Sequence, residues 1–285
     1  MPQTLLELHG DSSSPILHLA PANGFVLQSY APMYREFAGW RVLSCPPRAL
    51  WGDGQSPPWG VVNDWEHLAD DLLAAWDAYQ LGPLVAVGHS FGGIASLLAT
   101  IHRPQMVRAL VLLDPTLLHP NVLTMMADLK AQGLIEQHPL TQGALRRKRD
   151  FDSAAAAYER WRGSRLFADW DDEALRLYAQ HGTRPKPEGG VTLTWPAEWE
   201  AFYFSTGWAR TWEDLGRLDG LTPTLIVRGQ HSDIFVDDSV ERVRALLPNA
   251  DYAEIAGHGH LFPHSAPRQT AALVNEWLRG LGLPS

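Results

Sequence analysis

Short, wholly apolar runs recur along the first third of the chain and again near its end, with segments of helical spacing between them. Two of these runs, Leu84–Val87 and Ala109–Leu113, have the length of a strand. Between them, from near Phe91 onward, apolar residues recur on one face of a helix. Two wholly apolar strands joined by a helix are typical of a parallel sheet covered on both faces. The pattern therefore predicts an α/β fold with a mostly parallel, doubly wound sheet flanked by helices.

The same reasoning predicts further elements on either side of this unit. Strands are expected at Leu5–His9, Ile16–Leu19, Arg41–Cys45, Thr224–Val227 and Tyr252–Ile255. Helices are expected at Asn63–Tyr79, with Asn63 or Asp64 as the N-cap, at Val240–Leu247 and at Arg268–Leu281.

The alternation of strands and helices stops between Asp114 and Thr222. This stretch is mostly helical in pattern and predicts an insertion that emerges from the carboxyl edge of the sheet, where open α/β sheets bind ligands. We expect a core domain at 1–116 and 215–285, and a helical cap, or lid, at 117–214.

Composition and charge narrow the class of protein. The 285 residues are 45% hydrophobic and 19% charged, which is typical of a folded globular chain. A formal net charge of −9 argues against a nucleic-acid partner, and the basic run Arg146–Arg149 is interpreted as a solvated helix face. Cys45 is the only cysteine, so an intrachain disulfide is impossible. The N-terminal residues lack the pattern of a signal peptide and no long apolar run occurs, so we expect no membrane insertion and a cytoplasmic location.

One motif carries candidate chemistry. The hexapeptide GHSFGG, from Gly88 to Gly93, follows a predicted strand, opens a predicted helix and matches the G-x-S-x-G nucleophile elbow. Small residues at Gly88 and Gly92 would let strand and helix approach each other around Ser90. The backbone N–H of Phe91 would face a developing negative oxygen.

A serine nucleophile needs a base and an orienting acid. Asp233, just after the strand Thr224–Val227, is the favoured acid, and His260, in the glycine-rich loop after the last strand, is the favoured base. Asp114, at the end of an earlier strand, is the alternative acid. His258 is the alternative base.

Taken together, these segments resemble the α/β-hydrolase fold superfamily over essentially the whole chain. The resemblance rests on GHSFGG, WGDGQSPP, VRGQHSD, GHLFPHSAP and the early turn PANGF. It implies a cap inserted after the sixth core strand, and it implies the backbone N–H of Phe25 as a second oxyanion donor beside that of Phe91. Asn23 stands in the early turn where a histidine is commoner in the family.

The histidines of the last loop and the aromatic residues late in the insertion can each be interpreted as structural or as functional. His258, His260 and His264 have a loosely ligand-like spacing, but the same loop supplies no acidic or cysteine partner, so no metal and no cofactor are expected. The aromatic residues late in the insertion either form the cap's own core or line an apolar pocket over Ser90. The residues assigned to that pocket are Trp199, Phe202, Tyr203 and Trp208.

The sequence thus predicts a serine hydrolase that cleaves a carboxylic ester, thioester or lactone of a small to medium apolar substrate through an acyl-enzyme. Hydrolysis of carbon–carbon, amide or prolyl bonds would use the same three residues, and some members of the fold only bind small molecules. The expected partner is a small-molecule substrate, and the chain is expected to be a monomer or a homodimer.

Overall fold

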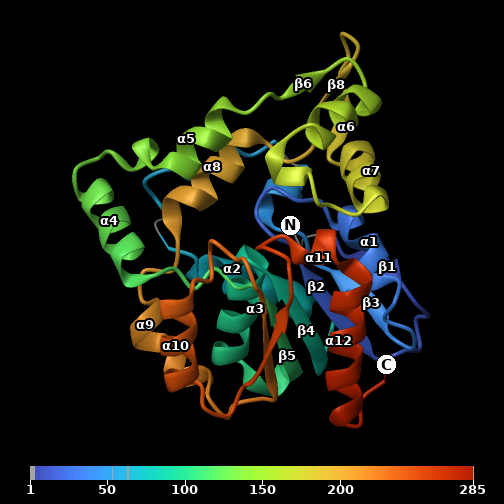
Figure 1. Ribbon diagram of the computed structural model, residues 1–285, viewed down its shortest axis with the longest axis vertical. Coiled ribbons are helices and arrows are strands. Elements are labelled where there is room, and N and C mark those ends of the chain that lie inside the picture. Colours follow the sequence, from blue (N-terminus) through green and yellow to red (C-terminus); the bar gives the residue numbers. More distant parts are fainter. Residues whose placement is uncertain (1–3, 53, 63, 285) are drawn as a thin grey trace.

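The predicted strands lie side by side in one sheet in the computed structural model of the chain, which describes residues 4–52, 54–62 and 64–284. Within these ranges the sheet has seven strands in the order β1-β3-β2-β4-β5-β9-β10. The pair β1–β3 is antiparallel and the other neighbouring pairs are parallel, as predicted for this α/β fold (Figure 1). The strand bounds are β1 Leu6–His9, β2 Ile16–Ala20, β3 Arg41–Ser44, β4 Leu84–His89, β5 Val107–Leu113, β9 Thr224–Gly229 and β10 Asp251–Ile255.

Both faces of this sheet are buried, which explains the unbroken apolar runs. Along β4, Val85 and Val87 belong to one hydrophobic cluster, whereas Leu84 and Ala86 belong to the other. Side chains alternate between the faces of a strand, so a strand covered on both sides needs apolar residues at every position.

Helices cover the two faces of the sheet. Residues of α1, α11 and α12 pack in the first cluster, and residues of α2, α3 and α10 pack in the second (Figure 1). Their bounds are α1 Ala31–Tyr34, α2 Glu66–Ala78, α3 Phe91–His102, α10 Asp237–Leu246, α11 Phe262–Ser265 and α12 Pro267–Gly280. Short 3-10 turns are η1 Leu27–Tyr30, η2 Arg48–Leu50 and η3 Pro104–Met106.

The insertion between β5 and β9 lies over the carboxyl ends of the strands (Figure 1). Its helices are α4 Pro120–Ala131, η4 Ile135–Gln137, α5 Pro139–Arg146, α6 Ala154–Arg162, η5 Arg165–Phe167, α7 Asp172–His181, α8 Ala197–Thr206, α9 Thr211–Asp214 and η6 Leu215–Leu218. It also holds a small antiparallel sheet of β6 (Asp150–Phe151), β8 (Val191–Leu193) and β7 (Thr183–Pro185). Strands of two or three residues are too short to show an alternating pattern, so the sequence predicted helices alone.

Some predicted details need correction. Among the described residues, the insertion follows the fifth strand in chain order, β5, rather than the sixth. The basic run is not one helix face, because α5 ends at Arg146 and the following arginines pair with acidic residues of α8. The N-cap candidate Asn63 lies outside the described residues, and the carboxylate of Asp64 accepts a hydrogen bond from the N–H of Glu66 at 3.0 Å. No helix in the described part of the chain is long and apolar enough to cross a membrane.

Candidate active site

Ser90 occupies the sharp turn between β4 and α3. Its backbone has φ 55° and ψ −119°, a conformation in which a non-glycine residue is strained. A Cβ atom on Gly88 would lie 2.4 Å from the carbonyl oxygen of Gly92, and one on Gly92 would lie 2.4 Å from that of Ala20. The glycines of the motif are therefore required by close backbone approach, and the turn lifts Ser90 to the edge of the sheet.

His260 lies beside Ser90 in the loop that follows β10. Its Nε2 is 2.9 Å from Ser90 Oγ, and its Nδ1 is 2.7 Å from Asp114 Oδ1. The structure thus brings together Ser90, the favoured base His260 and Asp114, the alternative acid.

The preference for Asp233 as the acid is wrong. Its side chain is exposed to solvent, whereas Asp114, at the carboxyl end of β5, is fully buried against His260. In the loop after β9, the residue that faces the site is Ser232, which directly precedes Asp233. Ser232 Oγ lies 2.6 Å from Asp114 Oδ1, and the N–H of Gly229 donates to Asp114 Oδ2 at 2.8 Å.

The site contains two hydroxyl groups that the sequence did not predict. Ser232 stands three residues after Gly229, and Thr116 follows Asp114 by two residues, with its Oγ1 3.0 Å from Ser90 Oγ. The signals were present as the spacing G-x-x-S and as the tripeptide DPT after a strand. Neither pattern predicts a hydroxyl at the site unless the positions of the two loops are known.

His89 braces the site from behind Ser90. The N–H of Ala22 donates to Tyr30 Oη at 3.0 Å, Tyr30 Oη lies 2.8 Å from His89 Nδ1, and His89 Nε2 lies 3.0 Å from the carbonyl oxygen of His260. Burial holds the pKa of His89 well below its usual value, so the ring is neutral. This chain of bonds joins the early turn to the loop that carries His260.

The two expected oxyanion donors differ in their surroundings. Phe91 is the first residue of α3, so its N–H lies at the helix N-terminus. The N–H of Phe25 donates to the carbonyl of Ala22 at a long 3.3 Å, and it would have to exchange this bond for one to the substrate. The role of Phe25 stays a prediction.

The cap contacts the early turn through a buried cluster. Tyr178 Oη donates to the carbonyl of Gly24 at 3.1 Å, and Asn23 Nδ2 donates to the carbonyl of Glu200 at 3.0 Å. Arg147 pairs with the carboxylate of Glu200 and donates to Tyr178 Oη at 3.1 Å. Residues of α7 and α8 thus hold the turn that precedes Phe25, and Arg147, just after α5, joins these two residues.

The other histidines of the last loop have separate partners. His258 Nδ1 lies 2.8 Å from Ser265 Oγ. His264 is fully buried, with Nε2 3.0 Å from Ser29 Oγ and its ring stacked on Trp170 at 3.9 Å. No group of three or more His, Cys, Asp or Glu residues that could hold a metal occurs within the described ranges.

The aromatic residues assigned to a substrate pocket are buried between cap and core. Trp199, Phe202, Tyr203 and Trp208 are at most 4% exposed. The ring of Tyr203 lies 4.5 Å from that of Phe91, so the cluster packs directly behind the nucleophile turn. Packing of the cap on the core accounts for this burial, and a role in lining a pocket stays a prediction.

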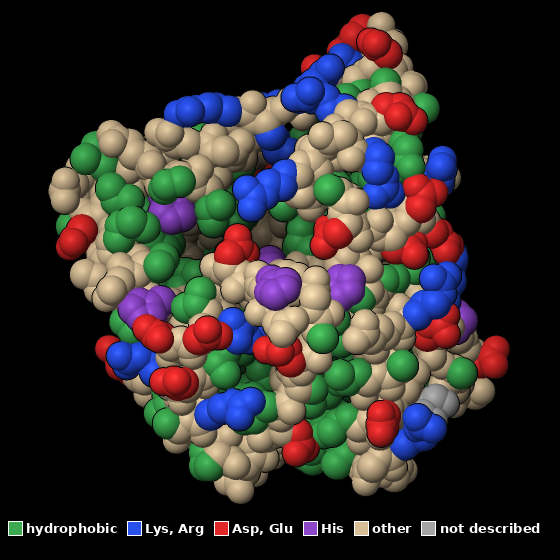
Figure 2. Space-filling model, in the orientation of Figure 1, with side chains coloured by type: hydrophobic (Ala, Val, Ile, Leu, Met, Phe, Trp, Pro, Cys, Tyr) green, Lys and Arg blue, Asp and Glu red, His purple; other side chains and the backbone are tan. Residues whose placement is uncertain are grey.

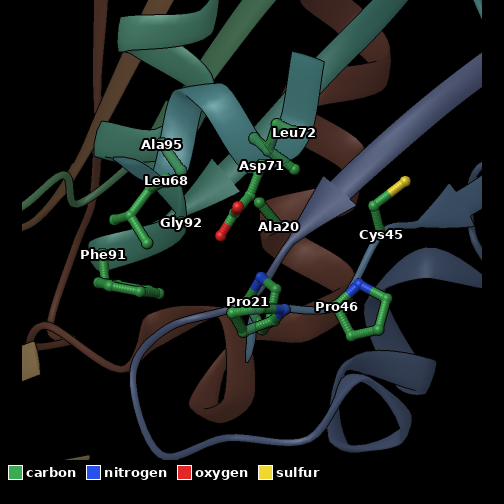
Figure 3. A pocket seen from close by; sticks show the side chains of 11 residues that line it. Ala20, Pro21, Cys45, Pro46, Leu68, Asp71, Leu72, Phe91, Gly92 and Ala95 are labelled. Carbon is green, nitrogen blue, oxygen red and sulfur yellow. The ribbon is translucent and has the colours of Figure 1, made fainter. Parts of the chain in front are cut away.

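A small cavity of about 20 Å³ lies beside the same turn, with space for about one water molecule (Figure 3). Its walls come from the end of β2, the loop after β3, α2 and the start of α3, including Pro21, Cys45 and Phe91. The carboxylate of Asp71 points into it, bonded at 2.7 Å to Arg48. Ser90, His260 and Asp114 do not line it, so it is separate from the reacting groups.

On the outer surface, a hollow opens between the cap and the core (Figure 2). Hydrophobic side chains gather on the α4–α5 side of this face (Figure 2). The exposed large hydrophobic residues in this part of the cap are Met125, Leu134 and Leu140. Such apolar surface beside a hollow suits an apolar ligand.

Comparison with known proteins agrees with the observed fold. A family described as the α/β hydrolase fold matches residues 39–267. The lipase LipV of Mycobacterium tuberculosis is 28% identical over 236 residues, which cover 80% of this chain and 81% of the lipase. Among solved structures, E-2-(acetamidomethylene)succinate hydrolase superposes with a TM-score of 0.74 at 19% identity, over 96% of this chain and 94% of that one. An esterase of M. tuberculosis superposes with a TM-score of 0.70 at 20% identity, over 94% and 86%. The chain belongs to the α/β hydrolase fold family, and these relatives support a hydrolytic role.

Proposed function

We propose that the chain is a serine hydrolase that cleaves a carboxylic ester, thioester or lactone through an acyl-enzyme. The observation that carries the proposal is the position of His260, which bridges Ser90 Oγ at 2.9 Å and Asp114 Oδ1 at 2.7 Å. Nucleophile, base and orienting acid within hydrogen-bonding distance are what acyl transfer at a serine requires.

The mechanism follows from these contacts. Ser90 Oγ attacks the carbonyl carbon while its proton passes to His260 Nε2. Asp114 holds the imidazole in the tautomer that leaves Nε2 free and stabilises the imidazolium. The N–H of Phe91, with that of Phe25 as the second donor, receives the oxyanion, and each such donor is worth roughly 3 kcal/mol. His260 then protonates the leaving group, and water attacks the acyl-enzyme with His260 as its base.

The substrate class is supported by the surface beside the site. The hydrophobic side chains that gather on the α4–α5 side of the face with the hollow favour a small to medium apolar substrate (Figure 2). The similarity to a lipase and to an esterase points to the ester bond first. The predicted cap at 117–214 would cover this substrate.

A fluorophosphonate probe tests the nucleophile, because it forms a covalent bond only with an activated serine. We expect labelling of the wild-type protein and none of Ser90→Ala. An unlabelled wild-type protein, or equal labelling of the variant, would exclude Ser90 as the nucleophile. Turnover of nitrophenyl esters graded by acyl length then defines the substrate.

The acid and the base are tested on the most active of these esters. Asp114→Asn should lower kcat/KM by about 10³- to 10⁴-fold, since the imidazole loses its orienting carboxylate. Asp233→Asn is the matched control and should stay close to wild type, because Asp233 is exposed. His260→Ala should abolish turnover while His258→Ala retains most of it. The reverse order in either pair would reassign that residue.

A further inference from the structure

Ser90 Oγ has two hydrogen-bonding neighbours rather than one. His260 Nε2 lies 2.9 Å away, and Thr116 Oγ1 lies 3.0 Å away. Thr116 follows Asp114 in the loop after β5, and its N–H also approaches the carbonyl of Ser90 at 3.4 Å. In the proposed mechanism His260 accepts the proton of Ser90, whereas Thr116 has no role.

The direction of each bond in this group follows from counting protons. Ser232 Oγ accepts from the N–H of Phe235 at 3.0 Å, so its own proton goes to Asp114 Oδ1. Asp114 also accepts from the N–H of Gly229, as expected of an ionised carboxylate. His260 Nδ1 must therefore carry a proton and donate it to Asp114.

The remaining bonds are then determined. A neutral His260 protonated at Nδ1 has an acceptor at Nε2, so Ser90 donates its only proton there. Ser90 Oγ can only accept from its other neighbour. The hydroxyl of Thr116 must be the donor.

We propose that Thr116 is a further catalytic residue, whose hydroxyl donates a hydrogen bond to Ser90 Oγ while negative charge develops on that oxygen. This inference rests on the proposed function. A hydrogen bond to a charged oxygen is about twice as strong as one to a neutral oxygen, so the bond is tighter in the transition state than in the resting enzyme.

The bond acts at two points of the reaction. In acylation, the Ser90 O–H bond breaks, its proton goes to His260 Nε2, and Oγ forms the bond to the carbonyl carbon. In deacylation, that carbon–Oγ bond breaks, Oγ leaves with the electron pair and regains a proton from His260. The proton of Thr116 stays on Thr116 throughout and only supports Oγ as its charge rises.

The test compares Thr116→Val, which keeps the shape but removes the hydroxyl, with Thr116→Ser, which keeps the hydroxyl. The control is Thr270→Val in α12, whose buried hydroxyl bonds only to the carbonyl of Ala266 in the described contacts. The rate constant for fluorophosphonate labelling reports attack by Ser90 alone, and burst kinetics with a nitrophenyl ester separate acylation from deacylation.

We expect Thr116→Val to slow labelling and both ester steps by about 10- to 100-fold, with KM little changed. Thr116→Ser and Thr270→Val should stay within about threefold of wild type. If Thr116→Val does not fold, Thr116→Ala is measured in its place against the same serine variant.

Two results would overturn the role of Thr116 while leaving the proposed function intact. One is a labelled wild type with equally fast labelling of Thr116→Val. The other is an equal loss in Thr116→Ser, which would show that the methyl group or the loop is what matters. A wild type that is never labelled would instead remove the proposed function, and this inference with it.

Discussion

The proposed nucleophile and the proposed acid share an unusual backbone conformation. Ser90 and Asp114 have φ of 55° and 43°, in the left-handed region that non-glycine residues seldom occupy. The N–H of Ser90 donates to the carbonyl of Leu113 at 2.9 Å, and that of Asp114 donates to the carbonyl of Val227 at 2.7 Å. Hydrogen bonds across neighbouring strands therefore hold both side chains at the sheet edge, and local strain is offset by the surrounding sheet.

Glycine substitutions test how tightly this turn is packed. Gly88→Ala would place a Cβ 2.4 Å from a backbone oxygen, so the free energy of unfolding should fall by about 1–3 kcal/mol or more. Gly143→Ala is the matched control, because it lies inside α5 with open space around it and should raise that free energy by about 1 kcal/mol. Urea unfolding measures both. A Gly88→Ala variant as stable as wild type would mean that the turn can relax.

At the scale of elements, the loops after β5 and β9 together provide the Asp114 carboxylate and its hydrogen-bond partners. The loop after β5 supplies Asp114 and Thr116. The loop after β9 supplies Ser232, whose hydroxyl bonds the Asp114 carboxylate together with the N–H of Gly229 at the end of β9. Because β5 and β9 are hydrogen-bonded neighbours in the sheet, either loop can reach His260. The carboxylate of this chain stands on the first of them.

The contact of the cap with the core is a second feature at this scale. The Arg147 and Glu200 side chains are 19% and 14% exposed, and the pair sits on the turn that contains Asn23 and Gly24. Arg147→Met would leave the Glu200 carboxylate buried without its cation. We expect a loss of about 3 kcal/mol in the free energy of unfolding, together with lower kcat as the turn shifts.

Arg149→Met is the control for this prediction. Its pair with Glu198 is 42% and 45% exposed, and such a surface pair contributes about 0–1 kcal/mol. Thermal unfolding and ester turnover compare the two variants. Equal stability of Arg147→Met and Arg149→Met would show that the buried pair does not hold the cap.

At the scale of the whole molecule, several histidines are buried and neutral. His18 in the second strand, His89 behind the nucleophile and His264 in α11 are all fully buried. Burial lowers the pKa of His18 to about 3 and holds the pKa values of His89 and His264 well below their usual value. The Nδ1 atoms of His18 and His264 have no hydrogen-bond partner among the described residues, so a proton there would be costly.

These histidines predict a fall in stability on acidification. Above pH 6.5 they are neutral in both the folded and the unfolded chain, so they add no pH dependence. Below pH 6.5 these histidines bind protons in the unfolded chain but stay neutral in the folded chain. Each of them therefore lowers the free energy of unfolding by about 1.4 kcal/mol per pH unit. For three groups the slope approaches about 4 kcal/mol per unit, and for His18 it ends near its folded pKa of about 3.

Urea unfolding at pH 8, 7, 6 and 5 measures this slope. His89→Gln removes one titrating group and should reduce the slope by up to about 1.4 kcal/mol per pH unit. Stability that is constant from pH 7 to pH 5 would contradict the prediction.

The sequence by itself determined the main strands and helices and the turn that carries Ser90, the proposed nucleophile. The runs Leu84–Val87 in β4 and Ala109–Leu113 in β5 are wholly apolar because both sheet faces are covered, and this pattern is visible in a few consecutive residues. The turn at Ser90 is equally local, since the glycines that permit it stand within two residues. The order of elements then placed His260 after the last strand.

Only the tertiary structure decided which carboxylate faces His260. Asp114 and Asp233 both follow parallel strands at the same edge of the sheet, so spacing along the chain does not separate them. The choice depends on how two loops more than a hundred residues apart close on each other, with Ser232 turned inward and Asp233 turned to solvent. The contact of Thr116 with Ser90 depends on the same closure. Strands, helices and tight turns depend on residues close together in the sequence, whereas hydrogen-bond partners across a site depend on the packing of distant segments.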